Sequence, residues 1–339
     1  MLASMIRSSR CQAMALAMVP LVALSFSPKP SADSAGRPSR VEFREVRVFP
    51  HHFLAYGQPW SPTHERLVMQ GGEGLSVYDA TRPQSGLHQI FKGAWVRQVT
   101  WSPDGDWLLL VIGDPNPTNT RTLIAVPWQG GTPDTLVEDE AFFPAIWASD
   151  GNVAYLTGSI VHWIRPRHGS DPPPMDPRDA PSLVTRHGEG GMNLQWIRPG
   201  KLETEPLAIP VRGYHILIAD AVPRLGRYLI RGIAADSASM LILNAHGGID
   251  ADLGAAGIPF EPSGLSGDGS LVIGYKEIDD GHTISSSKMY VASSRGAWSA
   301  RVEKVNAAVK ACFARTGRTI AYEDPIVGGV HVGSLSFEP

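Results

Sequence analysis

The sequence repeats one short phrase along its length, and that phrase constrains the fold more than any other feature. Its fullest copy is Trp101–Leu110, where Trp-Ser-Pro-Asp-Gly is followed by an apolar run. Proline presets φ in a tight turn and glycine accepts positive φ, so this copy predicts a strand, a turn and a second strand. Looser copies begin at Trp60, Trp147, Leu265 and Phe313. Such repeats are typical of stacked β units and predict a β-propeller.

The spacing of the copies predicts the number of blades. Most intervals between successive copies fall near the roughly 40–50 residues of a four-stranded blade. The interval from Trp147 to Val222 is longer, and we interpret residues 165–213, which include a run of prolines from Pro172, as a proline-rich insertion on one rim. A degenerate extra blade, suggested by Trp196–Gly200, is the alternative. The sequence thus predicts an all-β, six-bladed propeller of four-stranded antiparallel blades, or alternatively seven blades.

The two ends of the repeat region suggest how the ring closes. Residues 41–49 precede the first copy and alternate apolar side chains with arginine and glutamate, which predicts a half-buried strand. The last copy offers strands near 309–313, 319–323 and 329–335 and lacks a fourth. We therefore expect residues 41–49 to complete the last blade, because this arrangement leaves no open edge in the ring.

The first residues predict a secretory signal peptide. Arg7 and Arg10 precede an apolar stretch, Ala13–Phe26, that is too short to span a bilayer. We assign residues 1–25 to a cleaved signal peptide, with a buried N-terminal helix as the alternative. The protein is then expected in the periplasm or outside the cell.

The remaining chain is expected to form one domain. Residues 26–40, rich in proline, serine and alanine, are predicted to be a flexible lead-in, and 41–339 a single propeller domain. Cys312 is the one cysteine left after cleavage, so no intramolecular disulfide is expected. No later run reaches the roughly 18 apolar residues of a membrane span, and we expect a monomer that does not span the membrane.

Composition narrows the class of partner. Glycine and proline number 35 and 28 in 339 residues, above their usual shares of about 7% and 5%. They lie mostly between the apolar runs, where turns are expected. The net charge is −3 and no basic stripe is present, which argues against nucleic acid as a partner.

A family resemblance is carried by the segment from Trp101 to Gly131. Trp-Ser-Pro-Asp-Gly, an apolar strand and a further strand ending in a turn before Gly-Gly resemble the TolB-like, or WD40-like, propeller repeat family. The resemblance covers about 41–339 and is specific for fold. Members of the family include periplasmic interaction scaffolds, propeller domains attached to serine peptidases, and some lyases. Residues 27–40 are too few for the domain that TolB carries before its propeller, and no Gly-x-Ser-x-Gly nucleophile motif occurs, so no peptidase activity is expected.

Residues of the turn phrase itself are assigned structural roles. Asp104, Asp150 and Asp268 recur at one position of the turn, where a carboxylate accepts backbone N–H groups. Trp60, Trp101, Trp107 and Trp147 are expected in the core between blades.

Residues that could carry chemistry show no recognisable motif. His52, His215, His282 and His331 come from different repeats. Some propeller lyases of this repeat class hold a metal with histidines from several blades, but no matching motif surrounds these four, and solvated loop histidines are the simpler interpretation. The acidic run at Asp279 lacks the ligand spacing of a calcium loop. We predict no catalytic residue, no metal and no cofactor.

The mouth of the channel is the predicted binding surface. Loops that lead into the inner strands contain aromatic side chains and a few charges, the mixture that a peptide- or sugar-binding mouth needs. Packing between blades is the alternative role for these aromatics. The candidate binding residues are His52, Tyr56, Trp95, Arg97, Phe142, Phe143, His215, Glu261 and Lys310.

Two functional hypotheses remain. We favour a non-enzymatic, exported propeller that binds a protein or peptide partner in the cell envelope. The alternative is a metal-assisted or acid/base enzyme, a lyase or hydrolase, acting on a carbohydrate or lactone at the same mouth. That alternative requires histidines or carboxylates that converge on the channel axis.

Overall fold

The computed structural model describes residues 37–93, 96–113, 120–140, 142, 144–148, 151–166, 182–188, 191–207, 215–222, 225–233, 238–278, 286–305, 307–315 and 318–338. All of them belong to one compact unit, residues 36–339. Their regular structure is β-strand, apart from one short 3-10 helix, η1 (Pro83–Ser85). Among these residues there is no helix with the length and hydropathy of a membrane span.

Three small antiparallel sheets follow chain order. The first contains β2 (Phe53–Leu54), β3 (Arg66–Gly71), β4 (Gly74–Asp79) and β5 (Leu87–Lys92). The second contains β6 (Val96–Trp101), β7 (Trp107–Ile112), β8 (Arg121–Pro127) and β9 (Asp134–Glu140). The third contains β10 (Ala145–Trp147), β11 (Val153–Thr157) and β12 (Ile160–Ile164).

Two larger sheets follow. The seven-stranded sheet contains β13 (Ser182–Gly188), β14 (Gly191–Ile197), β15 (Glu205–Pro206), β16 (His215–Val222), β17 (Arg227–Ile233), β18 (Ala238–Leu243) and β19 (Ile249–Asp252). The eight-stranded sheet contains β20 (Glu261–Leu265), β21 (Leu271–Ile278), β22 (Ser286–Ser293), β23 (Ser299–Glu303), β1 (Arg40–Phe49), β26 (Val330–Glu338), β25 (Thr319–Glu323) and β24 (Val309–Phe313).

The predicted number of blades is wrong. The described strands form five hydrogen-bonded sheets rather than six or seven, and one of the five has three strands. Two joins between neighbouring repeats lower the count. β1 pairs with β26 and also, over two residues, with β23, which unites the strands of two sequence copies. The β13–β14 hairpin joins β16 through one parallel pair, Met192 with His215. Spacing between turns cannot reveal such joins.

The interval assigned to an insertion contains the three strands β13, β14 and β15, whereas the run of prolines from Pro172 lies outside the described residues. Through Val184 and Ile197 the β13–β14 hairpin packs onto β11 and β12. Through Leu183 and Trp196 it packs onto β17 and β18. The hairpin is therefore the part of the seven-stranded sheet that packs against the third sheet.

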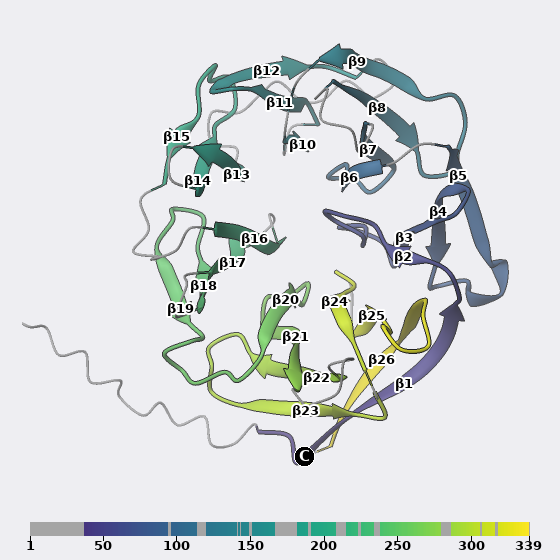
Figure 1. The fold of residues 1–339 in the computed structure, drawn as a ribbon, viewed down its shortest axis with the longest axis vertical. Coiled ribbons are helices and arrows are strands. Elements are labelled where there is room, and N and C mark those ends of the chain that lie inside the picture. The colour runs from purple at the N-terminus through teal and green to yellow at the C-terminus, as the bar shows by residue number, and fades with distance from the viewer. Residues whose placement is uncertain are drawn as a thin grey trace, which may run out of the picture. The chain divides into compact units, whose positions relative to one another are not determined.

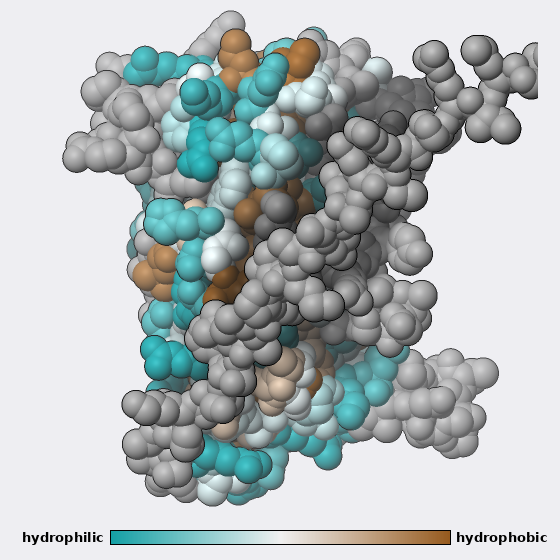
Figure 2. Space-filling view, turned by 90° about the vertical axis from the view of Figure 1, so that its left-hand side faces the viewer, coloured by the Kyte–Doolittle hydropathy of each residue, from teal (hydrophilic) through white to brown (hydrophobic). Residues whose placement is uncertain are grey.

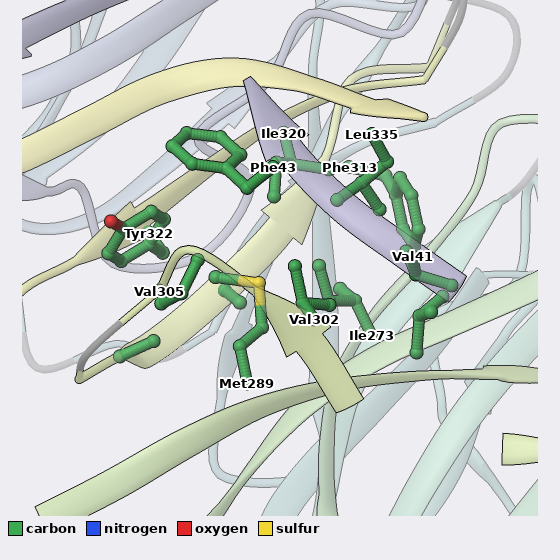
Figure 3. Packing of buried hydrophobic residues seen from close by; sticks show 13 residues of the cluster. Val41, Phe43, Ile273, Met289, Val302, Val305, Phe313, Ile320, Tyr322 and Leu335 are labelled. Carbon is green, nitrogen blue, oxygen red and sulfur yellow. The ribbon is translucent and has the colours of Figure 1, made fainter. Parts of the chain in front are cut away.

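The prediction that residues 41–49 complete the last repeat is confirmed. β1 pairs in antiparallel register with β26 over its whole length. Val41 and Phe43 of β1 point into the apolar cluster of Figure 3, where the rings of Phe43 and Tyr322 meet edge-on with centroids 5.3 Å apart. Because side chains alternate across a strand, the apolar–charged alternation read from the sequence places one face of β1 against the core.

Within residues 36–339 the strand groups lie side by side around an axis, with β2, β6, β10, β16, β20 and β24 innermost (Figure 1). The seam between the first and last repeats is filled by one core cluster that includes Phe49, Trp60, Tyr78 and Val332. On the side that faces the viewer in Figure 2, the described residues are mostly hydrophilic and the apolar ones form separate patches.

The turn carboxylates have the role predicted for them. Asp104 accepts the N–H of Asp106 and Asp268 accepts the N–H of Ser270, each at 3.0 Å. Asp150 lies outside the described residues. The recurring aspartate is thus explained by backbone geometry at both turns that the structure describes.

An arginine of the preceding sheet also binds this turn. Arg66 of β3 donates to the carbonyl oxygen of Gly105 at 3.1 Å, and Arg227 of β17 donates to the carbonyl oxygen of Gly269. Trp101, which opens the phrase, is 2% exposed in the core between the first two sheets. The repeated phrase is therefore a contact point between neighbouring sheets.

The Asp268 turn predicts a pH dependence of stability. Burial acts to raise the pKa of this carboxyl, but hydrogen bonds from Ser266 and Ser270 favour the carboxylate and bring the pKa below its ordinary value. A lowered folded-state pKa gives stability that is present above the unfolded-state pKa and lost as pH falls through the folded one. Between pH 7 and pH 3, the urea midpoint should fall further for the wild type than for Asp268→Asn. Equal falls would show that this carboxyl contributes nothing.

Candidate functional site

Exposed hydrophobic side chains gather where the first and last repeats meet. Phe53 and Tyr56, in the segment that leads from β1 to β3, are 57% and 62% exposed. Ile326 and Val327, in the turn between β25 and β26, are 58% and 78% exposed. With Lys310, these four residues are called the seam surface. Exposed apolar side chains that cluster in this way mark interaction sites more often than single ones do.

Backbone pairing explains why the segment after β1 and the turn before β26 lie at the same end of the contact between the first and last repeats. Phe49, the last residue of β1, pairs with Val330, the first residue of β26. Glu323, the last residue of β25, accepts the N–H of Leu54 at 2.8 Å. The segment after β1 and the turn before β26 therefore start from adjacent positions.

The backbone of Tyr56 is fixed to the neighbouring sheet. Its carbonyl oxygen accepts the N–H of Val99 at 2.7 Å, and Gln58 donates to the carbonyl of Val99 at 2.9 Å. Gly57 permits this approach, because it has φ +101° and a Cβ there would lie 2.4 Å from the Val99 oxygen. The exposed ring thus stands on an anchored backbone.

A β-bulge aims Lys310 at the same ring. The pairing of β24 with β25 shifts between Val309 and Cys312, and Lys310 has φ +48°, a conformation that costs a non-glycine residue on the order of 1–3 kcal/mol. The Lys310 Nζ lies 4.6 Å from the centroid of the Tyr56 ring and 3.3 Å from Glu323 Oε1. Bulges re-aim side chains, and this one holds an ammonium over an exposed aromatic ring.

Two further clusters of charged side chains lie near the starts of other inner strands, one around Glu261 and one around Arg97. Arg231 pairs with Glu261, the first residue of β20, at 2.8 Å. Burial raises the pKa of the neighbouring Tyr275 hydroxyl, and the charge of Glu261 raises it further. On the second sheet, burial lowers the pKa of the Arg121 guanidinium, and the positive charge of Arg97 lowers it further.

The predicted binding residues are only partly brought together. Tyr56 and Lys310 are in contact, whereas Glu261 and Arg97 belong to the other groups just described. His52 is half-buried, with its Nδ1 2.9 Å from the carbonyl oxygen of Pro50. The structure does not describe Trp95, Phe143 or the side chain of His215.

The assignment of Phe142 to the binding surface is wrong. Its side chain is 3% exposed and meets the Tyr155 ring edge-on, with centroids 5.4 Å apart. It belongs to the core between the second and third sheets, together with Val137. The alternative role for the aromatics, packing between blades, applies here.

Sequence reasoning missed Ile326 and Val327. They are adjacent apolar residues between Pro325 and Gly328, in a turn that the Asp324 carboxylate caps by accepting their N–H groups at 2.8 and 2.9 Å. An apolar pair enclosed by turn residues is the signal that could have identified them, because a turn offers no core to bury both.

The histidines that the alternative hypothesis requires do not converge in the described part of the chain. No group of three or more His, Cys, Asp or Glu there could hold a metal ion. The His331 ring lies 2.6 Å from Glu45 through Nδ1 and stacks on Tyr322, with centroids 4.9 Å apart. His282 lies outside the described residues.

No protein-family model and no curated protein matches the sequence, but solved structures do match the fold. The β-propeller domain of Cps50 (Swd1) from Myceliophteria thermophila is 12% identical with a TM-score of 0.50, covering 87% of this chain and 100% of that one. A putative TolB from Agrobacterium tumefaciens is 12% identical with a TM-score of 0.48, covering 90% and 99%. TolB from Acinetobacter baumannii is 10% identical with a TM-score of 0.47 over 77% of this chain, which spans 56% of the length of that TolB. The Cps50 match shows a β-propeller, so the predicted resemblance is confirmed at the level of propeller architecture.

Proposed function

We propose that this chain is a propeller scaffold that binds a protein or peptide segment at the seam surface. The observation that carries the proposal is the exposure of Phe53 and Tyr56, at 57% and 62%, together with that of Ile326 and Val327, whose turn starts from a position adjacent to their segment. Aromatic side chains supply large contact area at low entropic cost and dominate many binding interfaces.

Anchoring of the backbone supports the same role. Tyr56 is held by hydrogen bonds to Val99, and Lys310 is held between the Tyr56 ring and Glu323. A surface that is already ordered loses little conformational entropy when a ligand binds. Apolar side chains of a ligand would cover Phe53 and Tyr56, while the ammonium of Lys310 remains at the edge of the contact.

We also propose export, on the sequence of residues 1–25. The partner would then be a component of the cell envelope or its surroundings, and the chain would act as a monomer. Mass spectrometry of the protein recovered from a secreting host should give a mature N-terminus near residue 26. An intact N-terminus would count against export and leave the binding proposal untouched.

A peptide-display screen against the full chain tests the binding proposal. Peptides enriched on the wild type should lose about 30-fold in affinity towards Tyr56→Ala, since truncation of an aromatic anchor costs about 2 kcal/mol. Fluorescence anisotropy with a labelled peptide measures the loss. The control is Leu202→Ala, which removes a 68% exposed side chain beside β12 and should leave affinity unchanged. Equal losses in both variants, or no enriched peptide, would contradict the proposal.

A further inference from the structure

A pocket lined by arginines lies where β1 begins. Its volume is about 450 Å³, and its walls include Arg37, Ser39, Arg40, Ala300, Arg301 and Glu303. The pocket opens at the start of β1, whereas the seam surface lies beyond its end at Phe49. The ten residues of this strand separate the two places by roughly 30 Å.

Strand register brings two of these arginines together. Val41 of β1 pairs in parallel with Val302 of β23, so the preceding residues, Arg40 and Arg301, are neighbours on adjacent strands. Like charges in such positions repel each other. Both side chains are exposed, so solvent screens part of this repulsion, and a bound anion would offset the rest.

Carboxylates of the protein neutralise only part of the positive charge of these arginines. Arg40 pairs with Glu303 at 2.5 Å and with Glu42 at 2.6 Å. Within the described residues, neither Arg37 nor Arg301 forms an ion pair or a side-chain hydrogen bond. Both arginines line the pocket and are exposed to solvent.

The charge balance stays positive when the surroundings are included. Glu42 is also paired with Lys304 at 2.7 Å, and Glu338 lies opposite Arg40 in the β1–β26 pairing. Among the residues that the structure describes here, four cations therefore stand against three carboxylates. They are Arg37, Arg40, Arg301 and Lys304 against Glu42, Glu303 and Glu338.

We propose that this pocket binds an oxyanion of the phosphate or sulfate type, free or as an ester on a larger ligand. The planar guanidinium fork matches the oxygen spacing of such anions and binds them through two parallel hydrogen bonds. The Ser39 hydroxyl, which lines the pocket, is an additional donor. A volume of about 450 Å³ falls in the range of small-ligand sites and has room for a group attached to the anion.

Calorimetric titration of the full chain tests the proposal, with inorganic phosphate, inorganic sulfate and glycerol 3-phosphate as probes at matched ionic strength. The wild type should bind at one saturable site, and Arg37→Gln and Arg301→Gln should each weaken binding about tenfold, the worth of a charge-assisted hydrogen bond. Arg301→Lys should lie between them and the wild type, because it keeps the charge and loses the fork. Tighter binding of glycerol 3-phosphate than of phosphate would assign the pocket to esters, and the reverse order would assign it to the free anion.

The matched control is Arg295→Gln, which removes an exposed arginine that does not line the pocket and should leave binding unchanged. Absence of saturable binding by the wild type would overturn the proposal. So would equal weakening in Arg295→Gln and Arg301→Gln, since that pattern indicates attraction by overall charge. Thermal unfolding of each variant without ligand shows whether it is folded. A variant that is unfolded is replaced by Arg301→Lys, whose binding then decides the question.

Discussion

Replacing Arg315 by methionine should destabilise the protein by about 3–5 kcal/mol. The Arg315 side chain is 5% exposed and its guanidinium pairs with Asp220, whose side chain is 13% exposed. The same guanidinium donates to the carbonyl oxygens of Leu265 and Ala221, each at 2.7 Å. Removing it leaves a largely buried carboxylate without its cation and two carbonyls without this donor, at the point where β16, β20 and β24 meet.

Urea unfolding of two further variants controls this prediction. Arg315→Lys should lose less stability, because it keeps a positive charge beside Asp220 but cannot form the planar fork. Arg318→Met removes an exposed arginine that lies 4.7 Å from the centroid of the Phe337 ring, a contact worth about 0.5–1 kcal/mol. A loss in Arg315→Met no larger than that in Arg318→Met would contradict the role assigned to the buried pair.

Gly267→Ala should destabilise the protein by about 3 kcal/mol, at the upper end of the cost of overpacking. A Cβ at this position would lie 1.7 Å from the carbonyl oxygen of Arg315. Because the obstacle is backbone, the turn of one repeat and the strand end of the next have to move apart to admit a methyl group. This copy of the phrase therefore requires a residue without a side chain for packing alone, whereas the copy at Trp101 has Pro103 at the same position.

Gly72→Ala is the matched control for this substitution. No atom lies within 4 Å of a Cβ at Gly72, and its φ is not positive, so the change should be close to neutral. Thermal and urea unfolding of the two variants measure the difference. Similar midpoints would contradict a close approach of the Gly267 backbone to the carbonyl oxygen of Arg315.

The parts of the fold that have a local chemical signature were predictable from sequence. The turn at Asp104 follows from proline, aspartate and glycine in fixed order, and the burial of one face of β1 follows from its alternation. The number of sheets was not predictable, because the joins at Val41 and Met192 are backbone hydrogen bonds that any side chain permits.

The same distinction applies to the candidate site. Tyr56 and Lys310 were predicted as binding residues from their places beside expected inner strands, and in the structure Tyr56 follows β2 while Lys310 lies within β24. Phe142 has the same sequence context, yet it faces the core, and the orientation of a single loop residue depends on packing that no local pattern encodes. The Ile326–Val327 pair was missed because apolar residues are assigned to strands by default.

The pairing of β1 with β26 sets an order on folding. β1 finds its full partner only after β26, at the other end of the propeller unit, has been synthesised. Contacts between positions so distant in the chain form slowly, and β1 must meanwhile remain soluble with Val41 and Phe43 unburied. Charged residues on its other positions provide that protection, since they discourage pairing with other chains. They are Arg40, Glu42, Arg44, Glu45 and Arg47.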